Sequence, residues 1–261
     1  MTDAVLWATR LARSTESALA GLLDLVLPAR CAGCGEPARL LCPACRLALD
    51  EPARLRWPDP TPSGLPPPWV VADYAGAVRE ALLAHKEHGR LALAAPLGAA
   101  LARSTWAAAG TERPVCGRLV PPTILVPVPS RRAAVRERGH DATARLARRA
   151  AAVLRSGGVR ATVLAVLRLR SGVADQAGLG SRERAANLAG SMWVPSRYMA
   201  LVQGCAVVPV DDVLTSGVTL REAARALGAA GAEVTGVAAV AATVRRVPAL
   251  PPVLSRRPRT G

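Results

Sequence analysis

The segment VVPVDDVLTSGVTL, residues 207–220, restricts the fold more than any other feature of this sequence. It begins as an apolar run, continues with the adjacent carboxylates Asp211 and Asp212, and then offers hydroxyls and a glycine before a helical pattern starts. This order predicts a β-strand, a loop and the first turn of an α-helix. In an open parallel sheet such a loop lies at the carboxyl ends of the strands, where these folds bind their ligands.

The loop TSGVT, residues 215–219, contains the groups that bind a monophosphate. Thr215, Ser216 and Thr219 carry hydroxyl donors, and Gly217 lets the backbone approach a ligand closely. The helix that follows adds free N–H groups and the positive end of its dipole. The preceding carboxylates fit vicinal sugar hydroxyls or a hydrated Mg²⁺ beside the phosphate. The segment therefore predicts a site for a phosphorylated sugar, and the alternative is an ordinary strand-to-helix turn with acidic and hydroxyl capping residues.

Strand-like and helix-like segments alternate from residue 69 onward, which predicts an α/β domain with an open, mainly parallel sheet. The expected strands are 69–74, 123–129, 204–210 and 234–244. Helical stretches fill residues 75–106, one long helix is expected over 131–155, and another over 219–231. Pro209 lacks the N–H that a central strand uses, so it suggests a bulge or an edge position.

Four cysteines stand in the segment CAGCGEPARLLCPAC, as two CxxC pairs separated by seven residues. They are Cys31, Cys34, Cys42 and Cys45. Each pair can supply two corners of a tetrahedron around one Zn²⁺, and four protein ligands leave no open position, so the site would be structural. Two disulfides are the alternative, although nothing in the chain indicates an oxidising compartment. Cys116 and Cys205 have no partner at ligand spacing and are expected to pack as small apolar residues.

The composition is basic, with a formal net charge of +15, and Lys86 is the only lysine in a chain whose other basic residues are arginines. A field of this sign attracts nucleic acid or phosphorylated small molecules, and the alternative is a solubilising arginine-rich surface. No segment has the run of about 18 apolar residues that a membrane span requires, and residues 4–27 lack the pattern of a signal peptide. A cytoplasmic protein is expected.

Proline-rich and charged segments divide the chain into five parts. The expected parts are an amphipathic helix at 1–27, a four-cysteine zinc module at 28–56, a proline-rich linker at 57–68, an α/β domain at 69–247 and a disordered basic tail at 248–261.

The apolar strand, the two acids and the Thr-Ser-Gly-x-Thr loop resemble the phosphoribosyl pyrophosphate (PRPP) loop of type I phosphoribosyltransferases. The cysteine segment and the segments YAGAVREALLAHKEHG, LVPVPSRRAAVRERGHDATARLA and DQAGLGSRERAANLAG occur in the order seen in the competence protein ComF family. The resemblance covers residues 22 to about 245 and implies a zinc module before a phosphoribosyltransferase-like domain that binds PRPP with Mg²⁺. It also implies that the sugar hydroxyls contact Asp211 and Asp212, and that the phosphate contacts Thr215, Ser216, Gly217, Val218 and Thr219.

The same resemblance assigns further residues. Ser130, Arg131 and Arg132 match the pyrophosphate loop, and their guanidinium forks suit phosphate oxygens. Residues 171–190 match the mobile loop that closes over substrates, in which Arg182 and Arg184 would neutralise the leaving pyrophosphate. Lys86, with Arg79 and Gly89, matches a helical family pattern, and Lys86 is counted among the residues expected to bind PRPP with its Mg²⁺. For the arginines the alternative is a solvated surface.

Three histidines carry less information. His140 and its neighbour Asp141 depart from the residues common in the family, which puts any role of those positions in doubt. His85 and His88 stand three apart on an expected helix without a third metal ligand, so exposure to solvent is expected for both.

Two functions follow from this sequence. In the first, the chain transfers a phosphoribosyl group from PRPP to an acceptor that the sequence does not identify, in association with DNA uptake in natural competence. In the second, it is a non-catalytic scaffold whose basic surface binds single-stranded DNA or another DNA-uptake protein. The low aromatic content argues against a platform that stacks bases, but arginine contacts to the backbone would remain.

Overall fold

The computed structural model describes residues 30–110, 122–170 and 190–244. The expected N-terminal helix at 1–27, the basic tail at 248–261, Cys116 and the loop with Arg182 and Arg184 lie outside these ranges. In chain order the elements are α2 (Pro43–Leu47), β1 (Arg54–Leu55), β2 (Pro68–Val70), β3 (Ala72–Asp73), α3 (Gly76–Lys86), the 3₁₀ helix η1 (Leu91–Leu93), α4 (Ala94–Ala108), β4 (Thr123–Pro127), α5 (Arg132–Arg138), α6 (Ala142–Ser156), β5 (Ala161–Val163), β6 (Arg168–Leu169), β7 (Met192–Trp193), α8 (Ser196–Met199), β8 (Ala206–Leu214), α9 (Val218–Ala229), β9 (Glu233–Val234) and β10 (Val237–Ala242).

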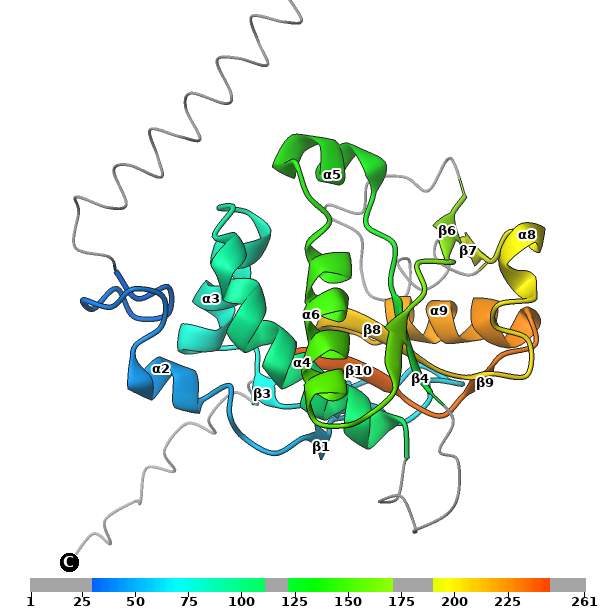
Figure 1. Ribbon diagram of the computed structural model, residues 1–261, viewed down its shortest axis with the longest axis horizontal. Coiled ribbons are helices and arrows are strands. Elements are labelled where there is room, and N and C mark those ends of the chain that lie inside the picture. The colour runs from blue at the N-terminus through cyan, green and yellow to red at the C-terminus, as the bar shows by residue number, and fades with distance from the viewer. Residues whose placement is uncertain (1–29, 111–121, 171–189, 245–261) are drawn as a thin grey trace, which may run out of the picture.

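The main sheet has the strand order β1-β2-β10-β8-β4-β5, with β3 also paired to β10 and β9 to β8. Its pairs are parallel except for the antiparallel pair of β1 and β2 at one edge. A separate antiparallel hairpin is formed by β6 and β7 beside α8 (Figure 1). The predicted α/β class with a mainly parallel sheet is confirmed.

Helices cover both faces of the sheet. Over residues 207–210 of β8 and 237–240 of β10, buried side chains alternate between two hydrophobic clusters, as the period of two in a strand requires. Val208 of β8 packs with α3, α4 and α6, whereas the preceding residue Val207 packs with α9 on the opposite face. Figure 1 shows α4 and α6 running beside each other in front of the sheet. The core is built mainly from alanine, valine and leucine.

The expected long helix over 131–155 is instead two helices, α5 and α6. The chain turns at Gly139, whose φ of 74° lies in the left-handed region that glycine adopts most easily. Asp141 then caps the second helix, because its carboxylate accepts a hydrogen bond from the Ala144 N–H. A single glycine in an otherwise helical pattern thus turns the chain between α5, which lies across the top of Figure 1, and α6, which runs down from it.

Strand β8 differs from the prediction in two ways. It continues through Asp211 and Asp212 to Leu214, so the two acids belong to the strand and the connecting turn is only residues 215–217. Pro209 lies in the middle of the sheet, where β8 pairs with β4 and β10, and the β4 register passes straight through the Val126 and Pro209 pair. The expected bulge or edge position was wrong, because the ladder bonds of neighbouring residues keep the strand in place. None of the described helices is long and apolar enough to cross a lipid bilayer.

Candidate functional site

Two carboxylates and one lysine meet near the carboxyl end of β8. Asp212 is almost fully buried, and its Oδ2 atom lies 2.5 Å from the Nζ atom of Lys86, the last residue of α3. Asp211 precedes it in the strand and accepts a hydrogen bond from the Asp212 backbone N–H. The only lysine of the sequence thus pairs with an acid 126 residues away in the chain.

The ion pair of Lys86 with Asp212 makes the pKa values of Asp211 and Asp212 differ. Burial raises the pKa of Asp211 well above its ordinary value, and the neighbouring Asp212 charge raises it further. Burial alone would also raise the pKa of Asp212, but the Lys86 ammonium outweighs it and lowers that pKa. The pKa of Lys86 is in turn raised, because the attraction to Asp212 exceeds the effect of burial. Asp212 is therefore a carboxylate at neutral pH, and Asp211 holds a proton more readily.

The turn after β8 is shaped by Gly217. Its φ is 75°, and it stands at the N-cap position of α9. A Cβ at this glycine would lie 2.9 Å from Leu65 Cδ2 and 3.0 Å from Pro58 Cγ. The proline-rich segment 57–68 thus packs against the turn through the buried side chains of Pro58 and Leu65. Glycine is required here by the backbone conformation and by this packing.

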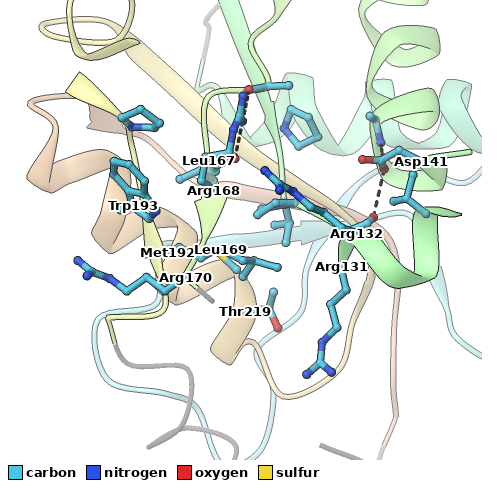
Figure 2. A pocket seen from close by; sticks show the side chains of 18 of the residues that line it. Arg131, Arg132, Asp141, Leu167, Arg168, Leu169, Arg170, Met192, Trp193 and Thr219 are labelled. Carbon is cyan, nitrogen blue, oxygen red and sulfur yellow. Dashed lines mark hydrogen bonds between the residues drawn. The ribbon is translucent and has the colours of Figure 1, made fainter. Parts of the chain in front are cut away.

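A cleft of about 1300 Å³ opens beside the same end of the sheet. Its walls come from the loop after β4, the first turn of α9 and the β6–β7 hairpin with α8. Figure 2 shows Trp193 and Arg170 at one end of the cleft, Asp141 at the other, and Thr219 and Arg132 between them. Among the residues that the structure describes, six arginines line it, namely Arg131, Arg132, Arg136, Arg168, Arg170 and Arg197, against the single acid Asp141. The cleft is therefore strongly cationic.

Several residues that the sequence singled out meet at this cleft. Ser130, Arg131, Arg132 and Thr219 all line it. Asp211 and Asp212 are not among the lining residues, but the loop after β4 is joined to β8 by the hydrogen bond from Val128 N to Val210 O at 2.9 Å. Thr215 is exposed and Ser216 half-buried in the turn beyond, with Val218 buried at the start of α9. Arg182 and Arg184 belong to the part of the chain that the structure does not describe.

Residues 144–250 match the family model of the phosphoribosyl transferase domain. The matched range contains β8 with its two acids, the turn at Gly217 and α9. A search of curated protein sequences found no match. Together with the parallel sheet and the neighbouring four-cysteine cluster, the match supports a phosphoribosyltransferase-like protein with a metal-binding module.

The sequence analysis missed a set of hydrogen bonds that joins β7 to α9 in the phosphoribosyltransferase-like domain. Glu222 of α9 is fully buried and accepts a hydrogen bond from the Met192 N–H of β7 at 3.0 Å. Arg225 completes the link, because it donates to Glu222 and to the Met192 carbonyl oxygen. The β6–β7 hairpin is thus fixed to the helix that begins at the turn. The long sequence separation leaves no local pattern that would have identified this contact.

The cysteine module has the donor set of a zinc site. The sulfur atoms of Cys31, Cys34, Cys42 and Cys45 all lie within 4.8 Å of one another. Tetrahedral Zn²⁺ with Zn–S bonds of about 2.3 Å separates its sulfurs by about 3.8 Å, so the arrangement fits the ion. Burial would raise the pKa of the Cys31 thiol, but backbone N–H donors, among them those of Cys42 and Gly33, outweigh it and lower the pKa to about 6. A thiolate at this position suits metal binding.

The module also contacts the helix that carries Lys86. A Cβ placed at Gly33 would lie 2.8 Å from Ala77 Cβ in the first turn of α3. Leu40 and Leu41 pack against the larger core cluster on the same side of the sheet. Any metal that holds the module therefore also supports the position of α3.

His85 is buried, not exposed as the sequence predicted. Only 1% of it is accessible, and its ring meets that of His140 edge to face at a centroid distance of 5.9 Å. Burial lowers the pKa of His85 to about 4, and the nearby charges of His140 and Arg145 lower it in the same direction. His88 is exposed, as predicted. The burial of His85 follows from its helical spacing to Val78, Ala81 and Leu82, which form the apolar stripe of α3.

Proposed function

We propose that this protein binds PRPP with Mg²⁺ at the carboxyl end of β8 and transfers its phosphoribosyl group to an acceptor. The observation that carries the proposal is the Asp211 and Asp212 pair in a central parallel strand, followed at once by a tight turn and the amino terminus of α9. The match of this same region to the phosphoribosyl transferase domain supports it. So does the arginine-lined cleft beside it.

Each group in the site would have a separate task. Asp211 and Asp212 accept hydrogen bonds from the two ribose hydroxyls, and the neutral form of Asp211 could also donate one. The turn at 215–219 holds the 5′-phosphate through its backbone N–H groups and hydroxyls, supported by the dipole of α9. Ser130, Arg131 and Arg132 hold the pyrophosphate and stabilise its charge as it leaves. Bound Mg²⁺ would supply further neutralisation of the pyrophosphate.

The order of the cysteine module, the arginine loop and the acid-bearing strand supports a closer assignment to the ComF family. A role in the cytoplasmic handling of incoming DNA during natural competence goes with that assignment. Under this assignment the four-cysteine site would be structural, because its four thiolates can complete the coordination of one Zn²⁺.

A second candidate is a scaffold that binds single-stranded DNA without turnover. The six arginines of the cleft and the net charge of +15 favour it, because phosphate contacts dominate binding of this kind. The affinity for an oligonucleotide should then fall steeply with salt and depend little on base sequence.

One pair of assays separates the two candidates. Purified protein is incubated with Mg²⁺, PRPP and a set of nucleobases and nucleotides, and the release of pyrophosphate is measured. Binding of a thymidine oligonucleotide is measured in parallel at low and high salt. Acceptor-dependent release of pyrophosphate supports the transferase. Salt-sensitive DNA binding with no consumption of PRPP supports the scaffold. If neither pyrophosphate release nor DNA binding is observed, both candidates are contradicted.

A further inference from the structure

Two arginines stack on the same tyrosine at the hairpin end of the cleft. The guanidinium carbon of Arg197 lies 4.7 Å from the ring centroid of Tyr198, and that of Arg168 lies 5.3 Å from it. Arg168 is fixed further, because it donates to the carbonyl oxygens of Ala165 and Leu167 at 2.8 Å each. Both arginines line the cleft. We call Arg168, Tyr198 and Arg197 the arginine–tyrosine cluster.

This cluster gathers positive charge without a carboxylate to balance it. Within the described ranges, neither Arg168 nor Arg197 forms an ion pair, whereas Arg54, Arg138 and Arg225 each pair with an acid. Arg170, which follows β6 and lines the same end, has no side-chain partner among the described residues either. Like charges held around one ring repel each other, and an anion bound between them would relieve that repulsion. The hydrogen bond and charge of Arg197, with the charge of Arg168, lower the pKa of Tyr198, which is consistent with a field of this sign.

An aromatic surface stands directly beside the cluster. Trp193 is 41% exposed, lines the cleft, and is the cross-strand partner of Arg168 in the β6–β7 hairpin. Directly opposed residues in an antiparallel pair have Cβ atoms about 5 Å apart on one face of the sheet. A planar ring that stacks on Trp193 would therefore bring its substituents within reach of the Arg168 guanidinium.

The hairpin holds this surface in a fixed relation to the predicted phosphate turn. Glu222 and Arg225 tie Met192, the neighbour of Trp193, to α9. Thr219, in the first turn of the same helix, lines the cleft on the side of that turn. Figure 2 shows Trp193 on the other side of the cleft from Arg131 and Arg132, which are assigned to pyrophosphate.

We propose that the arginine–tyrosine cluster binds an oxyanion carried by the acceptor, and that Trp193 stacks on the acceptor's planar ring. The substrate class is thus a heterocycle that bears a carboxylate or a phosphate, in preference to a neutral base. The term acceptor rests on the proposed function, but the anion site itself does not. Arginine suits this task because its planar fork matches both oxyanions.

The test compares three probes that share one ring and differ in charge. Uracil is neutral, orotate adds a carboxylate, and uridine 5′-monophosphate adds a phosphate. Each is titrated into the full chain by calorimetry at low salt, with PRPP and Mg²⁺ titrated separately. The wild type should bind orotate at least tenfold more tightly than uracil. Tighter binding of the nucleotide counts for the cluster only where Arg197→Gln weakens it, because its 5′-phosphate also fits the turn at 215–219.

Variants then assign the effect to residues. Arg197→Gln should weaken the preferred anion about tenfold, because a charge-assisted hydrogen bond is lost, and should leave uracil unchanged. Trp193→Ala should weaken all three probes by a similar factor. Tyr198→Phe keeps the ring that holds the arginines and should retain most of the binding. Arg148→Gln, at an exposed position of α6 outside the cleft, is the matched control and should change nothing. Melting temperatures show whether each variant is folded.

The outcomes separate this proposal from the proposed function. Uracil binding as tightly as both anions, or an Arg197→Gln variant that binds the anion normally, would overturn it. An equal loss of PRPP and anion affinity in Arg197→Gln would reassign the cluster to the pyrophosphate. Binding of an oligonucleotide but of none of the three probes would also contradict it. If the wild type binds orotate through Arg197 but does not bind PRPP, the proposed function fails and the anion site stands.

Discussion

Replacement of Lys86 by methionine removes the charge that faces buried Asp212 while keeping a side chain of similar length. Asp212 is 7% exposed and Lys86 33% exposed. Removing one partner of a buried ion pair costs about 3 to 5 kcal/mol, because the other charge stays buried without compensation. Water can partly replace the ammonium, which is one-third exposed, so we expect a cost of about 2 kcal/mol here. For a domain of this size that corresponds to a fall in melting temperature of about 4 to 8 °C.

The loss should also depend on pH. In the wild type the pKa of Asp212 is lowered, so the pair stabilises the fold above the ordinary carboxylate pKa, and this contribution is lost as pH falls through the folded-state pKa. Without Lys86, burial, the largest influence on Asp212, is opposed only by the hydrogen bonds with Asp211 and the Val213 N–H, so its pKa rises. Protonation of Asp212 then removes the buried charge of the variant at acid pH. The difference in free energy of unfolding between wild type and Lys86→Met should therefore shrink from pH 7 toward pH 4.

Urea denaturation of four proteins tests this reasoning. These are wild type, Lys86→Met, Asp212→Asn and the double variant, whose cycle isolates the coupling of the pair. Arg79→Met is the control, because Arg79 lies on the same helix and pairs with Glu80 at 2.5 Å, but both side chains are about half exposed. Its cost should stay below about 0.5 kcal/mol. A Lys86→Met cost equal to that of Arg79→Met, or one that does not change with pH, would refute the account of this pair.

Three further predictions concern other parts of the molecule. His85 has a folded-state pKa of about 4 against an ordinary value of 6.5, so stability should fall by about 3 kcal/mol as pH drops from 6.5 to 4. Denaturation of His85→Leu should lack this loss, and an unchanged pH profile would contradict the buried neutral ring. Gly217→Val should destabilise the protein by about 2 kcal/mol through the positive φ and the contact with Leu65, whereas Gly228→Ala in α9, where a Cβ meets nothing within 4 Å, should stabilise it slightly. Equal melting temperatures for the two glycine variants would contradict this account of the positive φ and the packing at Gly217. Elemental analysis should find about one Zn²⁺ per chain, lost in Cys31→Ser and Cys45→Ser but kept in Cys205→Ser, and a folded metal-free wild type would contradict a structural site.

Local patterns in the sequence were sufficient for the fold class and for the strand, turn and helix at residues 207–220. The alternation of apolar segments with glycine stops is a short-range signal, and the sheet follows from it. The split of the expected long helix at Gly139 was missed because alanine and arginine favour helix on both sides of it. The central place of Pro209 was missed because neighbouring strands, not local propensity, decide whether one lost hydrogen bond is tolerated.

The contacts that organise the candidate site are long-range, and no local pattern contains them. Lys86 was noted as the only lysine, but its pairing with Asp212 depends on where the fold places the last residue of α3 relative to β8. The same holds for Glu222 with Met192 and for Arg168 with Tyr198. The burial of His85 is different, because the sequence shows its helical spacing to the apolar residues of α3. That periodicity would have placed His85 on the buried face of the helix.

The most direct test of the central proposal is a calorimetric titration of PRPP with Mg²⁺ into the full chain at low salt. The account predicts saturable binding to the wild type, a matching rise in melting temperature, and at least tenfold weaker binding to Asp212→Asn, which keeps the shape of the side chain and removes its charge. Arg148→Gln should bind like the wild type. If the wild type gives no heat and no stabilisation with PRPP, or if Asp212→Asn binds it equally well, the carboxyl end of β8 is not a PRPP site.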